Sequence, residues 1–268
     1  MNSTNHPKGT ALVTGASSGI GAIYAERLAT RGHDMVLVAR DAAKLAALAE
    51  RLRASTGRRI ELLPADLTVK EDLLRVERRL QGDARIDLLV NNAGVGATRA
   101  LIESDADSLD AMIQLNVTAL TRLTRAAAPG MARRGNGAII NIASVVALAP
   151  ELLNGTYGGS KAFVLAFTQS LHHELGPKGI QVQAVLPGAT STDFWNVAGR
   201  PVSDLPSQIV MSAAAMVDAA LVGFDRKELV TIPSLPDAAD WERLEAARKA
   251  LGPNLSHARA AARYGLNH

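Results

Sequence analysis

Short apolar runs alternate with helix-like stretches along most of this chain, and this alternation limits the fold more than any other feature. Apolar runs of strand length fall at 10–14, 35–39, 59–63, 86–90, 138–142, 180–186 and 229–232. Helical patterns fall at 20–30, 41–54, 69–80, 108–134 and 157–176. Asp41 is expected to cap the second of these helices, and Pro129-Gly130 is expected to interrupt the fourth near its end. Short buried strands that alternate with helices indicate a parallel sheet covered on both faces. The sequence therefore predicts an α/β fold with a doubly wound parallel sheet of about seven strands.

We expect a single domain over residues 1–268, because no linker breaks the alternation before about Pro233. Residues 1–9 are expected to form a flexible tail and residues 10–232 the core. Residues 237–268 are expected to form a helical extension. Its apolar side chains share one helical face: Trp241, Leu244, Ala247 and Leu251. This face could cover a neighbouring subunit, close the active site or pack on its own domain.

Composition narrows the classes of function. The chain has no cysteine, which excludes disulfides and thiolate catalysis. The net charge is +3 with scattered basic residues, so we expect no nucleic-acid partner. No apolar run is long enough to span a membrane, and the N-terminus lacks the layout of a signal peptide, so a cytoplasmic location is expected. We expect no metal site either, since the adjacent His172 and His173 do not share a helical face.

A glycine-rich turn, TGASSGIG at residues 14–21, separates the first strand from the first helix. Glycines at such a turn allow the backbone to approach a pyrophosphate closely, and the helix N-terminus attracts the anion. The spacing is G-x-x-x-G-x-G, which differs from the commoner G-x-G-x-x-G. The turn predicts a dinucleotide site at the start of a βαβ unit.

The ends of the next strands refine the ligand. Arg40 follows the second strand, where its guanidinium suits a 2′-phosphate, and this favours NADP(H) over NAD(H). Asp66 follows the third strand and could accept a hydrogen bond from adenine or cap the next helix. The NNAG sequence at 91–94 follows the fourth strand, and it is either a plain turn or part of the ligand site.

Tyr157 and Lys161 are four residues apart and so lie on one face of a predicted helix. A lysine ammonium beside a phenol favours the phenolate and should lower the pKa of the tyrosine from its ordinary value of about 10. A tyrosine adjusted in this way can exchange a proton near neutral pH. The pair alone is weak support, because such spacing also arises by chance.

Taken together, these motifs resemble the short-chain dehydrogenase/reductase family. They occur in order along residues 10–232: TGASSGIG, NNAG, Asn116, Ser144, Tyr157-x-x-x-Lys161 and Pro187-Gly188. The resemblance implies a Rossmann-type fold and hydride transfer between NADP(H) and a carbon that carries oxygen. It also implies a homodimer or homotetramer built on the helices at 108–134 and 157–176.

The resemblance assigns four catalytic residues. Tyr157 is the acid/base, and Ser144 hydrogen-bonds the substrate oxygen. Lys161 binds the nicotinamide ribose and lowers the Tyr157 pKa, while Asn116 kinks a helix and holds a water in a proton relay. Cofactor contacts are implied for Gly15, Ser17, Ser18, Gly19, Ile20, Gly21, Arg40, Asp66, Leu67, Asn92, Ala93, Gly94, Tyr157, Lys161, Pro187, Gly188, Thr190 and Thr192. Ser18 stands where some NADP-preferring relatives carry a basic residue, which leaves Arg40 as the main 2′-phosphate partner.

The substrate side is expected in the loops after the strands, including a lid at residues 189–212. The predicted substrate contacts are Ser144, Val146, Phe194 and Trp195. Their apolar character favours a small-to-medium lipophilic ketone or alcohol, although the two aromatics could simply pack the lid on the core. Two alternatives keep the same fold: an epimerase or dehydratase, and a regulator that senses NADP(H) without turnover.

Overall fold

The computed structural model describes residues 8–266, so most of the predicted tail at 1–9 lies outside the described residues. The chain divides into two compact units, 1–233 and 234–268. The first unit holds the sheet and every predicted site residue. No helix in the described part of the chain is long and apolar enough to cross a membrane.

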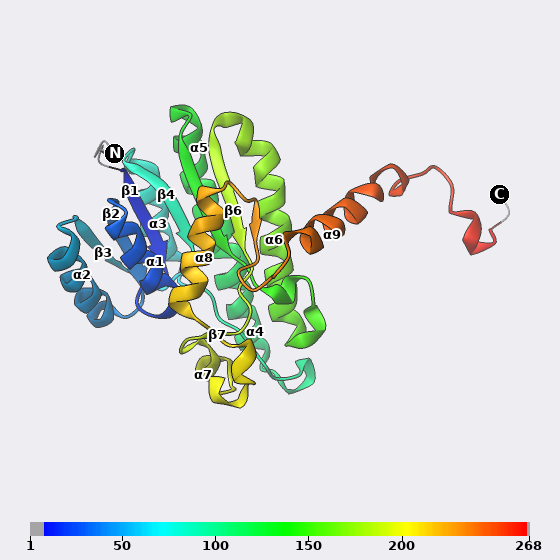
Figure 1. The fold of residues 1–268 in the computed structure, drawn as a ribbon, viewed down its shortest axis with the longest axis horizontal. Coiled ribbons are helices and arrows are strands. Elements are labelled where there is room, and N and C mark those ends of the chain that lie inside the picture. The colour runs from blue at the N-terminus through cyan, green and yellow to red at the C-terminus, as the bar shows by residue number, and fades with distance from the viewer. Residues whose placement is uncertain (1–7, 267–268) are drawn as a thin grey trace. The chain divides into compact units, whose positions relative to one another are not determined.

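A seven-stranded parallel sheet forms the centre of the first unit (Figure 1). Its strands are β1 (Thr10–Thr14), β2 (Asp34–Ala39), β3 (Ile60–Pro64), β4 (Ile86–Asn91), β5 (Gly137–Ile142), β6 (Ile180–Val185) and β9 (Val230–Thr231). The order across the sheet is β3-β2-β1-β4-β5-β6-β9, so the strand order reverses between β1 and β4. Open α/β sheets bind ligands at such a reversal, outside the carboxyl ends of the strands. The predicted fold class is confirmed.

Helices cover both faces of this sheet. They are α1 (Gly19–Thr30), α2 (Ala42–Thr56), α3 (Lys70–Gly82), α4 (Ala106–Ile113), α5 (Leu120–Arg134), α6 (Gly155–Leu175), α7 (Phe194–Ala198) and α8 (Ala213–Asp225). One apolar core contains Leu28 of α1, Leu48 of α2 and Met216 of α8, and the other contains Leu73 of α3 and Leu123 of α5. Alternate residues along the strands enter the two cores, as expected for strands buried on both faces.

Side-chain caps fix two helices that matter for the site. The Asp41 carboxylate accepts a hydrogen bond from Lys44 N at 2.9 Å, which confirms the predicted N-cap of α2. Asn154 caps α6, and its Oδ1 accepts from Thr156 N at 2.9 Å and Tyr157 N at 3.4 Å. The Asn154 cap therefore holds the backbone of Tyr157 at the start of its helix.

The expected helix at 108–134 is wrong in one respect. Pro129 does not interrupt it, since α5 runs through Pro129 to Arg134. The break lies earlier, in a π-helical turn at Gln114–Ala119 that joins α4 to α5. A π turn inserts an extra residue and commonly occurs at functional sites. The turn contains Asn116, the residue that the family resemblance assigned to a helix kink.

The lid region and the segment after it contain elements that the sequence did not predict. Helix α8 follows the lid, and a small parallel sheet pairs β7 (Thr190–Ser191) with β8 (Met211–Ser212). The β7–β8 pairing joins the two ends of the lid segment at 189–212. Helix α7 lies between these strands in the sequence and contains both lid aromatics.

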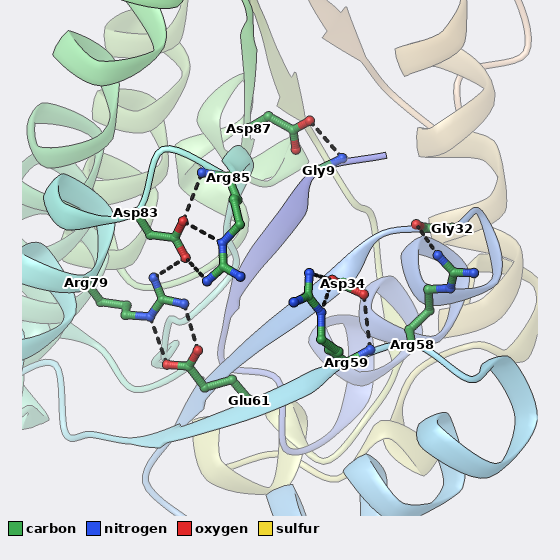
Figure 2. Close-up of polar contacts among 10 residues, drawn as sticks. All are labelled: Gly9, Gly32, Asp34, Arg58, Arg59, Glu61, Arg79, Asp83, Arg85 and Asp87. Atoms are coloured by element: carbon green, nitrogen blue, oxygen red, sulfur yellow. Dashed lines mark hydrogen bonds and ion pairs between the residues drawn. The ribbon is translucent and has the colours of Figure 1, made fainter. Parts of the chain in front are cut away.

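Around the amino ends of β2, β3 and β4, arginines and carboxylates form a polar network of two separate groups, one that joins Arg59 to Asp34 and one built around Arg79 (Figure 2). Arg79 contacts Glu61 at 2.7 Å and Asp83 at 2.6 Å, and Arg85 contacts Asp83 at 2.7 Å. Hydrogen bonds from Arg85 and Arg79 hold the pKa of Asp83 well below its usual range. This network lies at the end of the sheet opposite the predicted catalytic residues, so we assign it a role in stabilising the fold.

The second unit contains α9 (Ala238–Ala250), whose N-cap Asp237 accepts a hydrogen bond from Ala239 N at 2.9 Å. Ion pairs within α9 join Asp240 to Arg243 and Glu245 to Arg248. Within the predicted extension at 237–268, α9 covers only Ala238–Ala250, and Leu251 lies just beyond its last residue.

Candidate active site

Loops at the carboxyl ends of β1, β4, β5 and β6 bring the predicted catalytic residues together. Ser144 follows β5, and Val145 N donates to Pro187 O at 3.0 Å, which joins the loop after β5 to the segment after β6. Tyr157 and Lys161 come from the first turns of α6. Ser144, Tyr157 and Lys161 are all buried, with at most 8% of each exposed. A reaction here would proceed largely shielded from water.

Lys161 is held in place by the backbone of β5. Its Nζ donates a hydrogen bond to Ile142 O at 2.9 Å and lies 5.9 Å from the centre of the Tyr157 ring. The predicted pairing of the two side chains on one helical face is therefore present. Ser144 Oγ accepts from Val146 N at 3.3 Å and donates to Pro187 O at 3.5 Å.

The expectation that the pKa of Tyr157 lies below its ordinary value is wrong for this structure. Burial raises the pKa of Tyr157 to about 12, and a hydrogen bond with Ser144 only partly opposes this. Burial also lowers the pKa of Lys161 to about 8, since a low-dielectric site disfavours an ammonium ion. Burial is the largest cause of both pKa shifts, and the spacing of residues in the sequence does not show how deeply a side chain is buried.

Asn116 connects the π turn to the loop after β4 and to α6. Its Oδ1 accepts from Val95 N at 3.0 Å, and its Nδ2 donates to Val95 O at 2.9 Å and Ser160 Oγ at 3.1 Å. Ser160 Oγ in turn donates to Tyr157 O at 2.8 Å. The structure gives Asn116 a positioning role toward α6; the predicted water relay stays a prediction.

The glycine-rich turn after β1, called the glycine cradle below, packs so closely on itself and on the loop after β4 that Gly15 and Gly21 have no room for a side chain. Gly15 has φ +65°, and a Cβ there would lie 2.7 Å from Asn92 Nδ2. A Cβ at Gly21 would lie 2.2 Å from Gly15 O. The N-cap of α1, Ser18, is exposed and makes no side-chain cap. The first amides of α1 therefore lack a side-chain cap, as suits an anion at a helix N-terminus.

Thr14 is a residue whose contribution we did not predict. Its Oγ1 accepts from Asn92 N at 2.9 Å and Ala93 N at 3.0 Å and donates to Val90 O at 3.3 Å. The side chain of Asn92 also binds the end of β1, since its Nδ2 donates hydrogen bonds to Thr14 O at 2.9 Å and Gly15 O at 3.2 Å. These bonds join the ends of β1 and β4, and the threonine before the glycine turn was the available signal.

Arg40 and Asp66 lie together at the ends of β2 and β3, with Arg40 Nη1 3.9 Å from Asp66 Oδ2. The side chain of Arg40 is 73% exposed, so its guanidinium is accessible to a ligand. Asp66 Oδ1 accepts from Thr68 N at 2.9 Å and Thr68 Oγ1 at 2.7 Å, so it stabilises the turn before α3. Burial of Asp66 is outweighed by these bonds and by Arg40, and the pKa of its carboxyl is lowered.

The remaining predicted cofactor residues line the same edge. A Cβ at Gly94 would lie 3.0 Å from Asn116 Oδ1 and 3.5 Å from Lys161 Nζ, so this backbone adjoins the catalytic residues. A Cβ at Gly19 would lie 3.1 Å from the Thr192 methyl group, which places the segment after β6 against the glycine turn. Thr190 Oγ1 donates to Gly188 O at 3.1 Å. Contacts of these residues with a cofactor stay predictions, as do those of Ser17, Ile20, Leu67 and Pro187.

An apolar cluster surrounds Tyr157 on the substrate side. It contains Met112, Val146, Val95, Ala97, Leu109, Leu153 and Phe194. The rings of Tyr157 and Phe194 lie 5.8 Å apart between centroids, tilted by 44°. Trp195 differs, since it is buried and its Nε1 donates to Thr190 O at 3.0 Å. Phe194 therefore faces the site, whereas Trp195 fixes the lid; a substrate contact for Trp195 stays a prediction.

Known proteins with this arrangement are short-chain dehydrogenases. The family model described as short chain dehydrogenase matches residues 9–201. A short-chain dehydrogenase from Sphingobium yanoikuyae, solved in complex with NADPH, is 55% identical, with a TM-score of 0.92 over 94% of this chain and 98% of that one. A bulky-bulky ketone specific alcohol dehydrogenase from Comamonas testosteroni is 51% identical, with a TM-score of 0.90 over 97% and 99%. Very-long-chain 3-oxoacyl-CoA reductase from Anas platyrhynchos is 36% identical over 211 residues, 77% of this chain and 67% of that protein.

Proposed function

Because the chain belongs to the short-chain dehydrogenase family, we propose that it reduces lipophilic ketones to secondary alcohols with NADPH and catalyses the reverse oxidation. The observation that carries this proposal is the placement of the Tyr157 hydroxyl. The hydroxyl interacts with Ser144, the ring centre lies 5.9 Å from Lys161 Nζ, and the side chain is packed among apolar residues. A ketone with apolar substituents matches both parts of the site, because its oxygen suits the hydroxyl groups and its substituents suit the apolar side chains.

The residues of this chain fit the cofactor. The glycine cradle between β1 and α1 suits a pyrophosphate, and the exposed guanidinium of Arg40 suits a 2′-phosphate. The backbone of Gly94 adjoins Lys161, the residue expected to hold the nicotinamide ribose. When bound, NADPH supplies the hydride that reduces the carbonyl carbon. The overall reaction consumes the ketone, NADPH and one proton, and it yields the alcohol and NADP⁺.

The protein side of the reaction follows from the hydroxyl groups. Negative charge grows on the carbonyl oxygen during reduction, and Ser144 Oγ and the Tyr157 hydroxyl donate hydrogen bonds to it. Tyr157 then gives its proton to that oxygen. The charge of Lys161, with Nζ 5.9 Å from the ring centre, favours the phenolate that this transfer leaves. Asn116 and Ser160 hold α6 against the loop after β4 and so keep these donors aligned.

The two directions of the reaction should differ in pH dependence. Reduction needs protonated Tyr157, and a pKa of about 12 keeps the phenol protonated throughout neutral pH. Oxidation needs the phenolate, whose fraction grows with pH below that pKa. We expect alcohol oxidation at saturating NADP⁺ to rise about tenfold per pH unit from about pH 6 to 8, below the pKa of about 8 at which Lys161 loses its charge, and ketone reduction to stay nearly flat over the same range. Initial rates in both directions would check this, and equal slopes would contradict it.

Arg40 should determine the preference for NADPH. Removing a charged hydrogen-bond donor to phosphate typically changes binding by about tenfold or more. We therefore expect Arg40→Ala to raise KM for NADPH by that factor and to leave KM for NADH unchanged. Arg51→Ala is the matched control, since Arg51 is exposed on α2 and pairs with Glu26. Equal effects of Arg40→Ala on both cofactors would contradict a 2′-phosphate contact.

A screen of ketones and alcohols that follows NADPH absorbance tests the function. Ketone-dependent NADPH oxidation supports the proposal. Product formation without net change in the cofactor would indicate an epimerase or dehydratase, and tight NADPH binding without turnover would indicate a regulator. The cytoplasmic location and the homodimer or homotetramer stay predictions.

A further inference from the structure

Gly96, in the loop after β4, lies directly against the ring of Phe194. A Cβ built at Gly96 would lie 2.3 Å from Phe194 Cζ and 3.0 and 3.1 Å from Cε2 and Cε1. Side chains do not approach each other this closely, so only a glycine allows the ring its present place. The φ of Gly96 is not in the left-handed region, so backbone conformation does not require a glycine here. The close approach of Phe194 is what requires it.

The Phe194 ring also contacts the catalytic tyrosine. Its centroid lies 5.8 Å from that of Tyr157, and it meets Trp195 edge-on at the same distance and an angle of 89°. Trp195 is itself fixed by its hydrogen bond to Thr190 O. Phe194 is therefore held by neighbours on several sides and forms a fixed wall beside the Tyr157 ring.

A second contact ties the Gly96 loop to the lid helix. Thr98 N and Thr98 Oγ1 donate to Ala198 O at 3.2 Å and 2.8 Å, at the C-terminal end of α7. The Trp195 bond to Thr190 O fixes the other end of the same helix. The loop that provides space for the Phe194 ring therefore also holds the helix that carries it.

We propose that Phe194 determines which carbonyl substituents fit beside Tyr157, and that Gly96 is the positioning residue that keeps the ring there. The inference rests on the proposed ketone reduction. A fixed aromatic wall discriminates by size, because a substrate group and the ring cannot occupy the same volume. Gly96 acts only through the Phe194 ring, because it has no side chain of its own to contact a substrate.

The test compares kcat/KM for a methyl ketone and for a ketone with two aryl groups. Phe194→Ala should raise the kcat/KM for the diaryl ketone relative to that for the methyl ketone by about tenfold or more. This is the range expected for the gain or loss of a pocket contact. Gly96→Ala should change this ratio by a similar factor, since the clash falls on the tip of the Phe194 side chain and must move the ring from its present place. In the Phe194→Ala background, Gly96→Ala should have no further effect on the ratio.

Val197→Ala is the matched control on the same helix, because Val197 is 69% exposed. It should leave the ratio unchanged. The proposal is overturned if Phe194→Ala leaves the ratio unchanged, or if Gly96→Ala acts equally in both backgrounds. A crystal structure of Gly96→Ala adds a readout that needs no turnover: a displaced Phe194 ring supports the positioning role, and an unmoved ring refutes it. Failure of the wild type to reduce any ketone would instead count against the proposed function.

Discussion

Replacing Tyr157 with phenylalanine should abolish ketone reduction while NADPH binding remains. The variant loses the hydroxyl that donates to the substrate oxygen and supplies its proton. Positioned acid catalysis of this kind contributes about 10²–10⁴-fold, so we expect kcat to fall within that range or below detection. The ring itself remains, and so does its contact with Phe194. The NADPH dissociation constant, measured by fluorescence titration, should change by less than about threefold.

Tyr24→Phe is the matched control. Tyr24 is fully buried in α1, and its hydroxyl has no hydrogen-bond partner among the described residues. Removing an unpartnered buried hydroxyl should preserve both activity and stability. Wild-type turnover in Tyr157→Phe would remove Tyr157 from the mechanism. A parallel loss in Tyr24→Phe would mean that removal of any buried tyrosine hydroxyl disturbs the fold.

Replacing Gly21 with alanine should disrupt the dinucleotide site. The new Cβ would lie 2.2 Å from Gly15 O and 2.5 Å from Asn92 Nδ2, and the first of these is a backbone atom that cannot rotate away. The turn between β1 and α1 must therefore shift. A displacement of about 1 Å in a positioned site can reduce function about 10²-fold, and we expect the NADPH dissociation constant to rise by that order. Overpacking should also lower the free energy of unfolding by about 1–3 kcal/mol.

Gly82→Ala is the control for this substitution. Gly82 is the last residue of α3, and a Cβ there would meet no atom within 4 Å. Both NADPH binding and thermal stability should match those of the wild type. NADPH binding by Gly21→Ala that equals wild-type binding would show that the glycine cradle is not the cofactor site.

Much of the fold followed from local patterns. The seven expected strands are all present, because each is a short apolar run, and all but the edge strand β3 are largely buried on both faces of the sheet. Pro129 was misleading, since a proline usually ends a helix, yet α5 continues through it. The helix instead changes to a π-helical turn around Asn116, and the hydrogen bonds from Asn116 to Val95 and Ser160 stabilise that turn. Those partners are distant in sequence, so no local signal located the turn.

The candidate site, like the fold, could be predicted from the sequence only in part. Residues such as Gly15 and Lys161 belong to motifs with fixed spacing, and the motif predicted them. The pKa direction of Tyr157 depends on how completely α6 and the lid exclude water, which spacing does not report. The contact of Gly96 with Phe194 joins two loops that are far apart along the chain. Such contacts exist only once the sheet has brought its carboxyl ends together.

The most direct test follows the transferred hydrogen itself. Purified protein is incubated with a bulky apolar ketone and with NADPH that carries deuterium at both C4 positions of the dihydronicotinamide ring, and the product is analysed by mass spectrometry. The account predicts an alcohol with one deuterium on the carbon that bore the carbonyl oxygen, formed in equal amount to NADP⁺ and absent with Tyr157→Phe. Alcohol without deuterium, or deuterated alcohol formed equally well by Tyr157→Phe, would contradict it.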